Sequence, residues 1–454
     1  MRGLLVLFAL LSCVSFANDS LPRRGTLGVQ LRAVPEDVRT GLKLGAQEAV
    51  QVVEDGNGLL KYDLIVGVAG KKFKSFAEWQ ELLRGQTDKP RADLLVMRFH
   101  TETQHKTGQQ VGWIQSREQV DVQQRPVDET DHYVTLYDHV VSNGHKIRTF
   151  VTKPKSPGKH PVLFWIQGIN ASSVDFPLNA KNYIAPVMKP FADDGFVVVR
   201  VEKTGVGDSE GGPARLVGWD EELDIYRQAL KALDKYDFVD RDNIFVFGHS
   251  MGGCHAPVVC SETPVKGIIT YGTVAMSWLE WEVRAPRIQG PLSGQTHAQV
   301  DQDVRQITQF YNYVFNEKRS IAWIKKTHPE LAAFAAGQSP DGVMLGDRSI
   351  KYMQEVNDRN FTDYWAKLGK TRVLALFGEF DWVSLREDQT TVADAVNMAN
   401  PGCAEFKVVP QSDHIFSKCV GWQDSFDRFA KPGSEFNPEI VKVLRDWIDG
   451  VMKG

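Results

Sequence analysis

The chain has 454 residues, and at roughly 100–200 residues per domain this length allows two to four domains and excludes a single small module. Apolar residues make up 42% and charged residues 24% of the chain. This is close to ordinary globular usage and excludes a disordered or fibrous protein. The 53 Lys and Arg residues and the 57 Asp and Glu residues give a formal net charge of −4, so we expect no nucleic-acid partner.

Residues 1–17 have the layout of a secretory signal peptide. Arg2 supplies a positive charge, residues 4–14 are apolar, and Ser15-Phe16-Ala17 places small residues before a cleavage site that follows Ala17. The apolar stretch is too short to span a bilayer, and no later segment approaches a membrane span. An alternative is a lipoprotein anchored through Cys13, with an unusually short leader. We therefore expect an exported protein, either secreted or periplasmic.

The remaining cysteines are too few for a disulfide scaffold in a chain of this length. A bridge between Cys403 and Cys419 is not expected, because a strand over 404–410 would separate Cys403 from the following loop by about 20 Å. Bridged Cα atoms lie within about 7 Å of each other. The four cysteines beyond the leader are Cys254, Cys260, Cys403 and Cys419.

Residues 25–115 predict a small α+β unit with a Ser75-capped helix over 76–84. The segments 25–29 and 60–65 resemble the carboxylate-binding loop and a strand entry of a PDZ domain of the permuted bacterial type, although Tyr62 stands where that family usually has Gly. The resemblance implies that backbone N–H groups of Leu27, Gly28 and Val29 hold the C-terminus of an extended peptide. The alternative is a packing module that binds nothing.

Residues 116–130 are mostly polar and predict a linker. From residue 131 onward, a hairpin around Asn143-Gly144 is followed by alternating strands and helices. The strands are continuous apolar runs, which indicates a mainly parallel sheet with helices on both faces. The expected strands are 161–167, 195–202, 243–249, 265–271, 373–377 and 405–409, and a final helix covers 438–451.

A candidate nucleophile lies in Gly248-His249-Ser250-Met251-Gly252, which has the form G-x-S-x-G. The apolar run before it predicts a strand, and Met251 can begin a helix. A serine on such a strand-to-helix turn projects its hydroxyl above the sheet, and the flanking glycines relieve crowding. The new helix also directs N–H groups toward the site where an oxyanion forms.

A serine nucleophile needs a base, and the base needs an orienting acid. Asp381 follows the strand 373–377, and His414 follows the next strand. Both loops open at the carboxyl edge of the sheet, as the serine turn does, so the three side chains can converge. Glu379 and Asp413 are alternative acids, and Asp413 is the weaker one because it adjoins His414.

At this point residues 131–454 resemble an α/β-hydrolase. The resemblance rests on the serine turn, on the acid and histidine loops, and on the glycine-rich turn 202–211. It implies an oxyanion hole formed by the N–H groups of Met251 and Ile169. Similar enzymes usually begin the second of these loops with His-Gly, whereas this chain has Gln167-Gly168.

An insertion at about 274–370 has a mostly helical pattern and many aromatic residues, which predicts a cap over the active site. Trp278, Trp281 and Tyr311 are candidates for the substrate pocket, although each could equally belong to the core of the cap.

The leading hypothesis is an exported serine hydrolase that cleaves carboxylic esters through Ser250, His414 and Asp381. One alternative is a secreted serine peptidase of the aminopeptidase or dipeptidyl-peptidase type. A second alternative is a non-catalytic protein that binds peptides. No cofactor is expected, and no metal site is expected because closely spaced Cys and His ligands are lacking.

Overall fold

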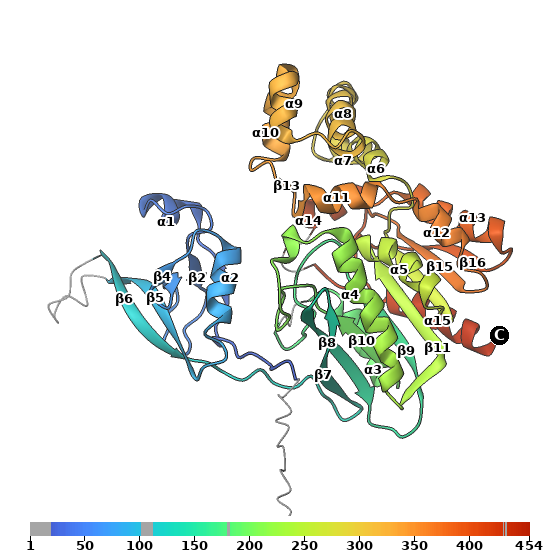
Figure 1. Cartoon of the computed structure of the whole chain (residues 1–454), viewed down its shortest axis with the longest axis horizontal. Coiled ribbons are helices and arrows are strands. Elements are labelled where there is room, and N and C mark those ends of the chain that lie inside the picture. Colours follow the sequence, from blue (N-terminus) through green and yellow to red (C-terminus); the bar gives the residue numbers. More distant parts are fainter. Residues whose placement is uncertain (1–19, 101–111, 179–181, 430, 432–433) are drawn as a thin grey trace, which may run out of the picture.

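The computed structural model describes residues 20–100, 112–178, 182–429, 431 and 434–454. Its strands form a large sheet, a smaller N-terminal sheet and a short hairpin in the cap. The N-terminal sheet and the large sheet belong to two units that lie side by side (Figure 1). The expected signal peptide, with Cys13, lies outside the described residues. None of the helices in the described part of the chain is long and apolar enough to cross a bilayer.

The N-terminal unit is an antiparallel sheet with the strand order β1-β2-β3-β5-β6, and β4 pairs with β3. Helix α2 is capped by Ser75, whose side chain accepts a hydrogen bond from the N–H of Glu78, as the sequence predicts. The elements of this unit are β1 (Leu31–Ala33), α1 (Glu36–Gly41), β2 (Val50–Val52), β3 (Leu64–Val68), β4 (Lys71–Lys72), α2 (Phe76–Arg84), β5 (Arg91–His100) and β6 (Gly112–Asp121).

The end of this unit differs from the prediction. Strand β6 pairs with β5 along its whole length, from Gly112 opposite His100 to Asp121 opposite Arg91. The expected linker at 116–130 therefore begins inside a strand, and the sheet extends to Asp121. The sequence concealed this strand because β6 lies at the edge of the sheet and exposes alternate polar side chains.

Tyr62, which stands where the PDZ resemblance leads one to expect glycine, has a φ of 75°. This is the left-handed region that glycine adopts without steric cost. The backbone at position 62 thus adopts the left-handed conformation although the residue is tyrosine and not glycine. The antiparallel sheet and helix agree with an α+β unit, and its assignment to the PDZ family stays a prediction.

The second unit contains an eight-stranded sheet with the order β16-β15-β12-β11-β9-β10-β8-β7. The six strands from β16 to β10 pair in parallel, and β8 and β7 add antiparallel pairs. Asn143 and Gly144 join β7 to β8 with positive φ values of 48° and 77°, which confirms the predicted turn. The strands are β7 (Tyr133–Ser142), β8 (His145–Pro154), β9 (His160–Ile166), β10 (Val197–Val201), β11 (Val239–His249), β12 (Gly267–Tyr271), β15 (Arg372–Gly378) and β16 (Ala404–Val409).

Both faces of this sheet are buried. In β9, Val162, Phe164 and Ile166 belong to the core on one face, whereas Leu163 and Trp165 belong to the core on the other. Successive side chains of a strand point to opposite faces, so burial of both faces explains the unbroken apolar runs in the sequence. One face packs on α3 (Ala185–Asp193) and α15 (Glu439–Lys453), and the other on α4 (Trp219–Lys231), α5 (Met251–Glu262) and α13 (Arg386–Ala399).

The predicted insertion is largely helical, and its outermost helices, α8 to α10, stand above the rest of the unit in Figure 1. Trp281 at its start contacts the loop after β15, because its Nε1–H donates to the carbonyl of Val383 at 3.2 Å. The cap elements are α6 (Trp278–Arg284), α7 (Pro286–Leu292), α8 (His297–Tyr311), α9 (Ile321–Thr327), α10 (Ala332–Gln338), β13 (Met344–Leu345), β14 (Arg348–Ser349), α11 (Ile350–Asn357) and α12 (Phe361–Ala366).

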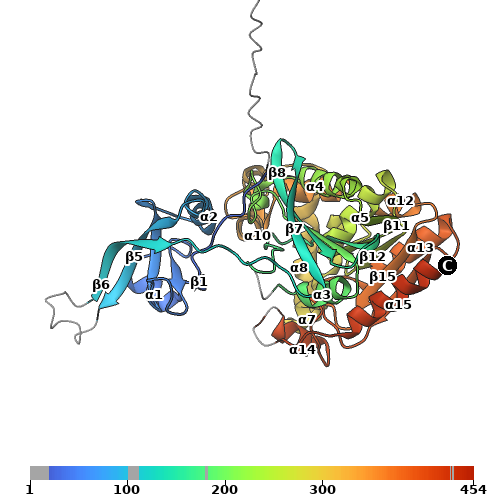
Figure 2. The same cartoon turned by 90° about the horizontal axis from the view of Figure 1, so that it is seen from below.

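Buried ion pairs and backbone contacts join the two units. Arg125 lies in the segment of chain between β6 and β7. It pairs with Asp175 and Asp208, and all three side chains are almost fully buried. Arg84 at the end of α2 donates to the carbonyls of Gly205 and Ser209 in the turn after β10. Figure 2 shows the N-terminal unit meeting the larger unit along one narrow side.

Candidate active site

Ser250 lies on a strained turn between β11 and α5, with φ 53° and ψ −123°. The two flanking glycines are required by close backbone contacts. A Cβ at position 248 would lie 2.5 Å from the carbonyl oxygen of Gly252, and a Cβ at position 252 would lie 2.1 Å from that of Ile166. The turn thus has the geometry expected of the G-x-S-x-G motif.

His414 and Asp381 form a buried pair in the loops after β16 and β15. Nδ1 of His414 lies 2.8 Å from Oδ2 of Asp381. The carboxylate also accepts hydrogen bonds from the hydroxyl of Ser384 and from the N–H groups of Val383 and Ser384. Burial opposes ionisation of Asp381, but the neighbouring imidazole and these donors outweigh it and lower its pKa. The carboxylate is therefore held in its charged form.

One backbone segment lies between this pair and Ser250. The N–H of Ser250 donates to the carbonyl of Tyr271 at 2.8 Å. The next residue, Gly272, packs against the pair so closely that a Cβ there would lie 2.8 Å from both Oδ2 of Asp381 and Nδ1 of His414. The structure thus brings the three predicted residues to the same edge of the sheet.

His249 supports the histidine loop. Its Nε2 donates to the carbonyl of His414 at 2.7 Å, and the hydroxyl of Tyr183 lies 3.0 Å from its Nδ1. Burial, with His414 nearby, lowers the pKa of His249 to about 3, so the ring is neutral. Nothing in the sequence pattern around His249 identified this contact.

The two alternative acids do not bond the imidazole. Oδ1 of Asp413 accepts hydrogen bonds from the N–H groups of Ile415 and Ser417. Glu379 accepts the N–H of Gln411 at 2.7 Å. Asp413 thus holds its own turn, Glu379 joins the loops after β15 and β16, and Asp381 is the acid that contacts His414.

The loop after β9 packs against Ser250 from the other side. A Cβ at position 168 would lie 3.2 Å from Cβ of Ser250. Nζ of Lys203 donates to the carbonyl of Gly168 at 2.5 Å. In a trans peptide the N–H points opposite to the carbonyl, so this contact directs the N–H of Ile169 away from Lys203. Among the described residues, that N–H has no hydrogen-bond acceptor.

A buried ionic cluster lies beneath this loop. Glu222 on α4 pairs with Lys203 at 2.9 Å and with Arg348, and Arg348 in turn donates from Nε to the carbonyl of Ile169 at 3.0 Å. Burial opposes ionisation of Glu222, but Arg348 and Lys203 outweigh it and hold its pKa at about 2. Two cations anchored on one carboxylate therefore fix the carbonyls of residues 168 and 169.

Sequence reasoning missed this cluster. In the sequence, Lys203 belongs to the glycine-rich turn 202–211, and a lysine two residues after a buried strand is a usable signal. Glu222 is one of three acidic residues in the first turn of α4, and nothing in the sequence distinguishes it from the other two. Arg348 enters from the cap, and nothing in the sequence connects it with Glu222.

The other predicted residues of the active site and substrate pocket lie in the hydrophobic core or pack against it. Met251 is the first residue of α5 and is 3% exposed. Trp278 and Tyr311 are buried in the core of the larger unit, and Trp281 is half-buried against it. Trp278 also donates to the carboxylate of Glu282 at 2.9 Å, and burial raises the pKa of that carboxyl to about 7.

The predicted peptide-binding loop lies in the N-terminal unit, where Leu27 is buried and its carbonyl accepts a hydrogen bond from Asn57 at 2.7 Å. Gly28 has a φ of 67°, and Val29 packs at the margin of the same core. The four cysteines of the described chain are free thiols. No group of three or more potential metal ligands occurs among the residues that the structure describes.

Known proteins are similar to this chain in sequence or in fold. A probable dipeptidyl-aminopeptidase B from Talaromyces marneffei is 37% identical over 103 residues, which cover 21% of this chain and 11% of that protein. The chain thus spans about a tenth of the length of this curated relative. Among solved structures, Est1E from Butyrivibrio proteoclasticus has 15% identity and a TM-score of 0.43, over 70% of this chain and 99% of that one.

Carboxyl esterase 2 from Tuber melanosporum has 14% identity and a TM-score of 0.45, over 72% of this chain and 89% of that one. The family described as serine aminopeptidase, S33 (Hydrolase_4), matches residues 179–415. This match spans more than half of the chain and contains the serine turn, the acid and the histidine, so the protein belongs to the S33 serine aminopeptidase family of α/β-hydrolases.

Proposed function

We propose that the protein is a serine hydrolase that cleaves carboxylic esters, with Ser250 as nucleophile, His414 as general base and Asp381 as the acid that orients it. The observation that carries the proposal is the hydrogen-bonded Asp381–His414 pair packed against Gly272, next to the strained turn of Ser250. Family membership supports hydrolytic chemistry. Esters come first because an alcohol leaves more easily than an amine.

In the proposed reaction, Oγ of Ser250 attacks the carbonyl carbon of the substrate while Nε2 of His414 accepts the hydroxyl proton. The imidazolium then gives this proton to the leaving alcohol as the acyl-enzyme forms. Water, activated by the same imidazole, releases the acid and restores the serine. Asp381 holds Nδ1–H of the ring and stabilises the imidazolium.

The oxyanion of the intermediate would be bound by the N–H groups of Met251 and Ile169. Met251 opens α5, whose N-terminal end carries a partial positive charge. The contacts of Lys203 and Arg348 with the two neighbouring carbonyls support Ile169 as the second donor, since they fix the peptide plane before substrate arrives. A preorganised donor of this kind is typically worth about 3 kcal/mol in the transition state.

Labelling with a fluorophosphonate probe tests this proposal. We expect the wild-type protein to become labelled and Ser250→Ala to remain unlabelled. Ser261→Ala is the matched control, because Ser261 lies on the same helix and its hydroxyl only bonds the carbonyl of Val258. Absence of labelling in folded wild-type protein, or labelling of Ser250→Ala, would overturn the proposal.

A peptidase is the second candidate, and it is favoured by the family description and by Glu282 on the cap. A free α-amino group needs an anionic partner, and Glu282 is a half-buried acid on the helix whose Trp281 contacts the loop of Asp381. Rates on aminoacyl p-nitroanilides and on p-nitrophenyl esters of graded chain length would separate the candidates. Cleavage of nitroanilides that is lost on N-acetylation and in Glu282→Gln would favour the peptidase.

Two further assignments are proposals from sequence. The leader at 1–17 would export the protein, and N-terminal sequencing of the secreted or periplasmic form should begin at Asn18. The loop Leu27-Gly28-Val29 would bind peptide C-termini, as a PDZ domain does. Binding of a peptide library with free C-termini, but not of the same peptides as amides, would support this assignment.

A further inference from the structure

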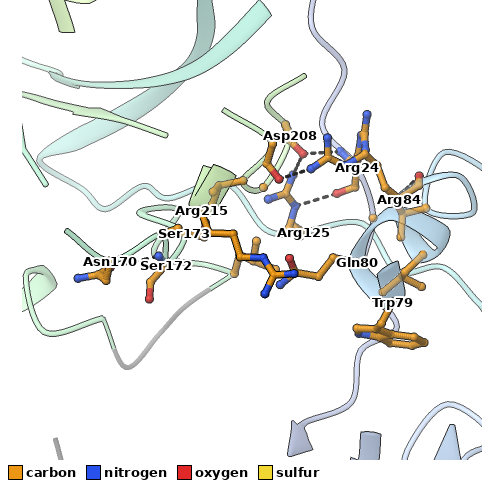
Figure 3. Close-up of a pocket in the computed structure, with 18 of the residues that line it drawn as sticks. Arg24, Trp79, Gln80, Arg84, Arg125, Asn170, Ser172, Ser173, Asp208 and Arg215 are labelled. Carbon is orange, nitrogen blue, oxygen red and sulfur yellow. Dashed lines mark hydrogen bonds and ion pairs between the residues drawn. The ribbon is translucent and has the colours of Figure 1, made fainter. Parts of the chain in front are cut away.

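A cavity of about 680 Å³ lies between the N-terminal unit and the larger unit. One wall is formed by α2 and the segment before β1, and the other by the loops that follow β9 and β10. Figure 3 shows Arg215 extending from the larger unit toward the helix that carries Gln80 and Arg84. Neither unit alone encloses this space, so it exists only because the two units are joined.

Four arginines line the cavity, against the two carboxylates of Asp208 and Asp347. Asp208 is already shared between Arg125 and the buried Arg148, and Arg125 also pairs with Asp175. The charges of this inner group therefore largely compensate one another. The four lining arginines are Arg24, Arg84, Arg125 and Arg215.

The other guanidinium groups are less well compensated. Nη1 of Arg24 is buried and has no hydrogen-bond partner within the described chain. Arg215 forms no ion pair or side-chain hydrogen bond with any described residue, although its charge contributes to lowering the pKa of Asp341. Arg84 bonds backbone carbonyls, and its nearest carboxylate, on the exposed Glu81, is 3.9 Å away. Burial and the charge of Arg24 together lower the pKa of Arg84. The cavity thus holds excess positive charge.

The cavity borders one loop of the proposed active site. Ile169 and Asn170 line it, and the preceding residue, Gly168, packs against Ser250. Trp79 and Leu83 of α2 add apolar surface beside the arginines. A ligand that fits these walls has an apolar body and ends in an anion, and the planar guanidinium pairs well with a carboxylate.

We propose that this interdomain cavity binds the carboxylate end of a substrate whose reacting carbonyl lies at Ser250, with Arg24, Arg84 and Arg215 as the anion-binding residues. The inference rests on the proposed function and adds a substrate class to it: esters or amides that carry a second, free carboxylate. That carboxylate belongs either to the acyl group, as in a dicarboxylic monoester, or to the leaving group, as at the C-terminus of a peptide.

Two matched substrate pairs test the proposal and distinguish these sources. The first pair is the mono-p-nitrophenyl ester of adipic acid and neutral p-nitrophenyl hexanoate. The second is 4-acetoxybenzoate and neutral phenyl acetate, which places the carboxylate on the leaving group. We expect kcat/KM to favour the carboxylate substrate at least tenfold in one pair, and this preference to weaken as salt screens the charges. No preference in either pair would overturn the proposal.

Charge variants identify the residues responsible. Arg24→Ala and Arg215→Ala should each lower the ratio of kcat/KM for the preferred carboxylate substrate over its neutral partner at least fivefold, and Arg215→Glu should lower it further. Arg305→Ala is the matched control, because Arg305 lies on the exposed surface of α8 with a side chain that is 79% exposed. An unchanged ratio in both Arg24→Ala and Arg215→Ala would contradict the assignment.

Binding to the Ser250→Ala protein separates failure of this proposal from failure of the proposed function. Calorimetry would compare monomethyl adipate with dimethyl adipate, which lacks the free carboxylate, and we expect the monoester to bind at least fivefold more tightly. If binding depends on Arg24 and Arg215 while the wild-type protein shows no labelling, the cavity assignment stands and the hydrolase assignment fails. If the wild-type protein is labelled but neither pair shows a preference, the hydrolase stands and the cavity assignment fails.

Discussion

The two sides of Ser250 are built on different principles. On one side, Asp381 and His414 form a single hydrogen-bonded pair whose ring is further positioned through its own backbone carbonyl by His249. On the other, Lys203 and Arg348 contact the backbone of a loop, and both pair with Glu222 beneath it. One side presents an imidazole to the proposed reaction. The other presents a backbone held by buried ion pairs, in which burial lowers the pKa of Lys203 to about 7.

This difference follows from the electrostatics of each side. The low pKa of Glu222 and the raised pKa of Arg348 keep the Glu222–Arg348 ion pair charged at all ordinary pH values. Such a pair holds a peptide plane and exchanges no proton. The imidazole of His414, with a carboxylate at only one of its nitrogens, can accept a proton at the other. Substitutions on the two sides should therefore produce different losses.

The largest effect is expected on the histidine side. His414→Ala removes the proposed base, and we expect kcat on p-nitrophenyl esters to fall about 10⁴-fold or more in protein that remains folded. His297→Ala, which alters an exposed histidine at the start of α8, is the control and should keep full activity. A fall in kcat of less than tenfold for His414→Ala would exclude His414 as the base.

A smaller loss is expected on the loop side. Glu222→Gln leaves Lys203 and Arg348 as buried charges without their carboxylate, so we expect unfolding to become easier by about 3–5 kcal/mol. Movement of the loop should also lower kcat about 10²-fold, with a smaller change in KM, because the proposed donor acts mainly in the transition state. Steady-state kinetics and chemical denaturation measure the two effects.

A triple variant separates structure from activity on this side. Lys203→Met with Glu222→Leu and Arg348→Met removes all three charges of the cluster. It should recover part of the lost stability, since apolar replacements remove the need to compensate buried ions. It does not restore the contact with the carbonyl of Gly168, so kcat should stay low. Recovery of both stability and kcat would show that the cluster serves stability alone.

The same contrast explains how much the sequence could predict. Ser250, Asp381 and His414 each follow a strand of a parallel sheet, so strand periodicity and chain order were enough to bring them to one edge. The cluster under the loop offered no such pattern. Glu222 and Arg348 are 126 residues apart, and their pairing depends on how the cap folds back on α4. Sequence patterns within single helices and strands do not predict a contact between residues so far apart in the chain.

Strand β6 and the interdomain contacts show the same limit in the N-terminal unit. A half-exposed edge strand has few apolar residues, so the segment that ends at Asp121 was predicted as linker. Arg125 pairs only with residues far away in sequence, and Arg84 gains the backbone carbonyls that it bonds only when the two units meet. The sequence thus predicted the elements within each unit better than the contacts between them.

Asp388, a buried carboxyl on the histidine side, allows a test of the comparison through the pH dependence of stability. Asp388 on α13 accepts the N–H groups of Ala275 and Met276, in the segment that continues from Gly272, while its Oδ2 has no partner within the described chain. Burial raises the pKa of Asp388 from 3.8 to about 7. The folded state therefore binds a proton more tightly than the unfolded state between these values, so stability declines as the pH rises from about 4 to 7.

Asp388→Asn should remove this part of the pH dependence. Relative to the wild-type protein, we expect the variant to gain about 1–3 kcal/mol in the free energy of unfolding between pH 4 and pH 8. Urea denaturation across that range measures it, with Asp394→Asn on the same helix as control. If the wild-type and Asp388→Asn curves stay parallel, Asp388 is ionised at no extra cost in the fold.

The smallest effect is expected from Tyr183→Phe, which removes only the hydroxyl that bonds Nδ1 of His249. His249 would keep its contact with the carbonyl of His414 but lose the partner that fixes its tautomer. A hydrogen bond of this kind contributes about 1 kcal/mol, so kcat should fall about fivefold with an unchanged KM. Tyr364→Phe, on α12 of the cap, is the control. A loss near that of His414→Ala would mean that Tyr183 acts on the reaction directly, whereas no loss would mean that packing alone fixes the histidine side.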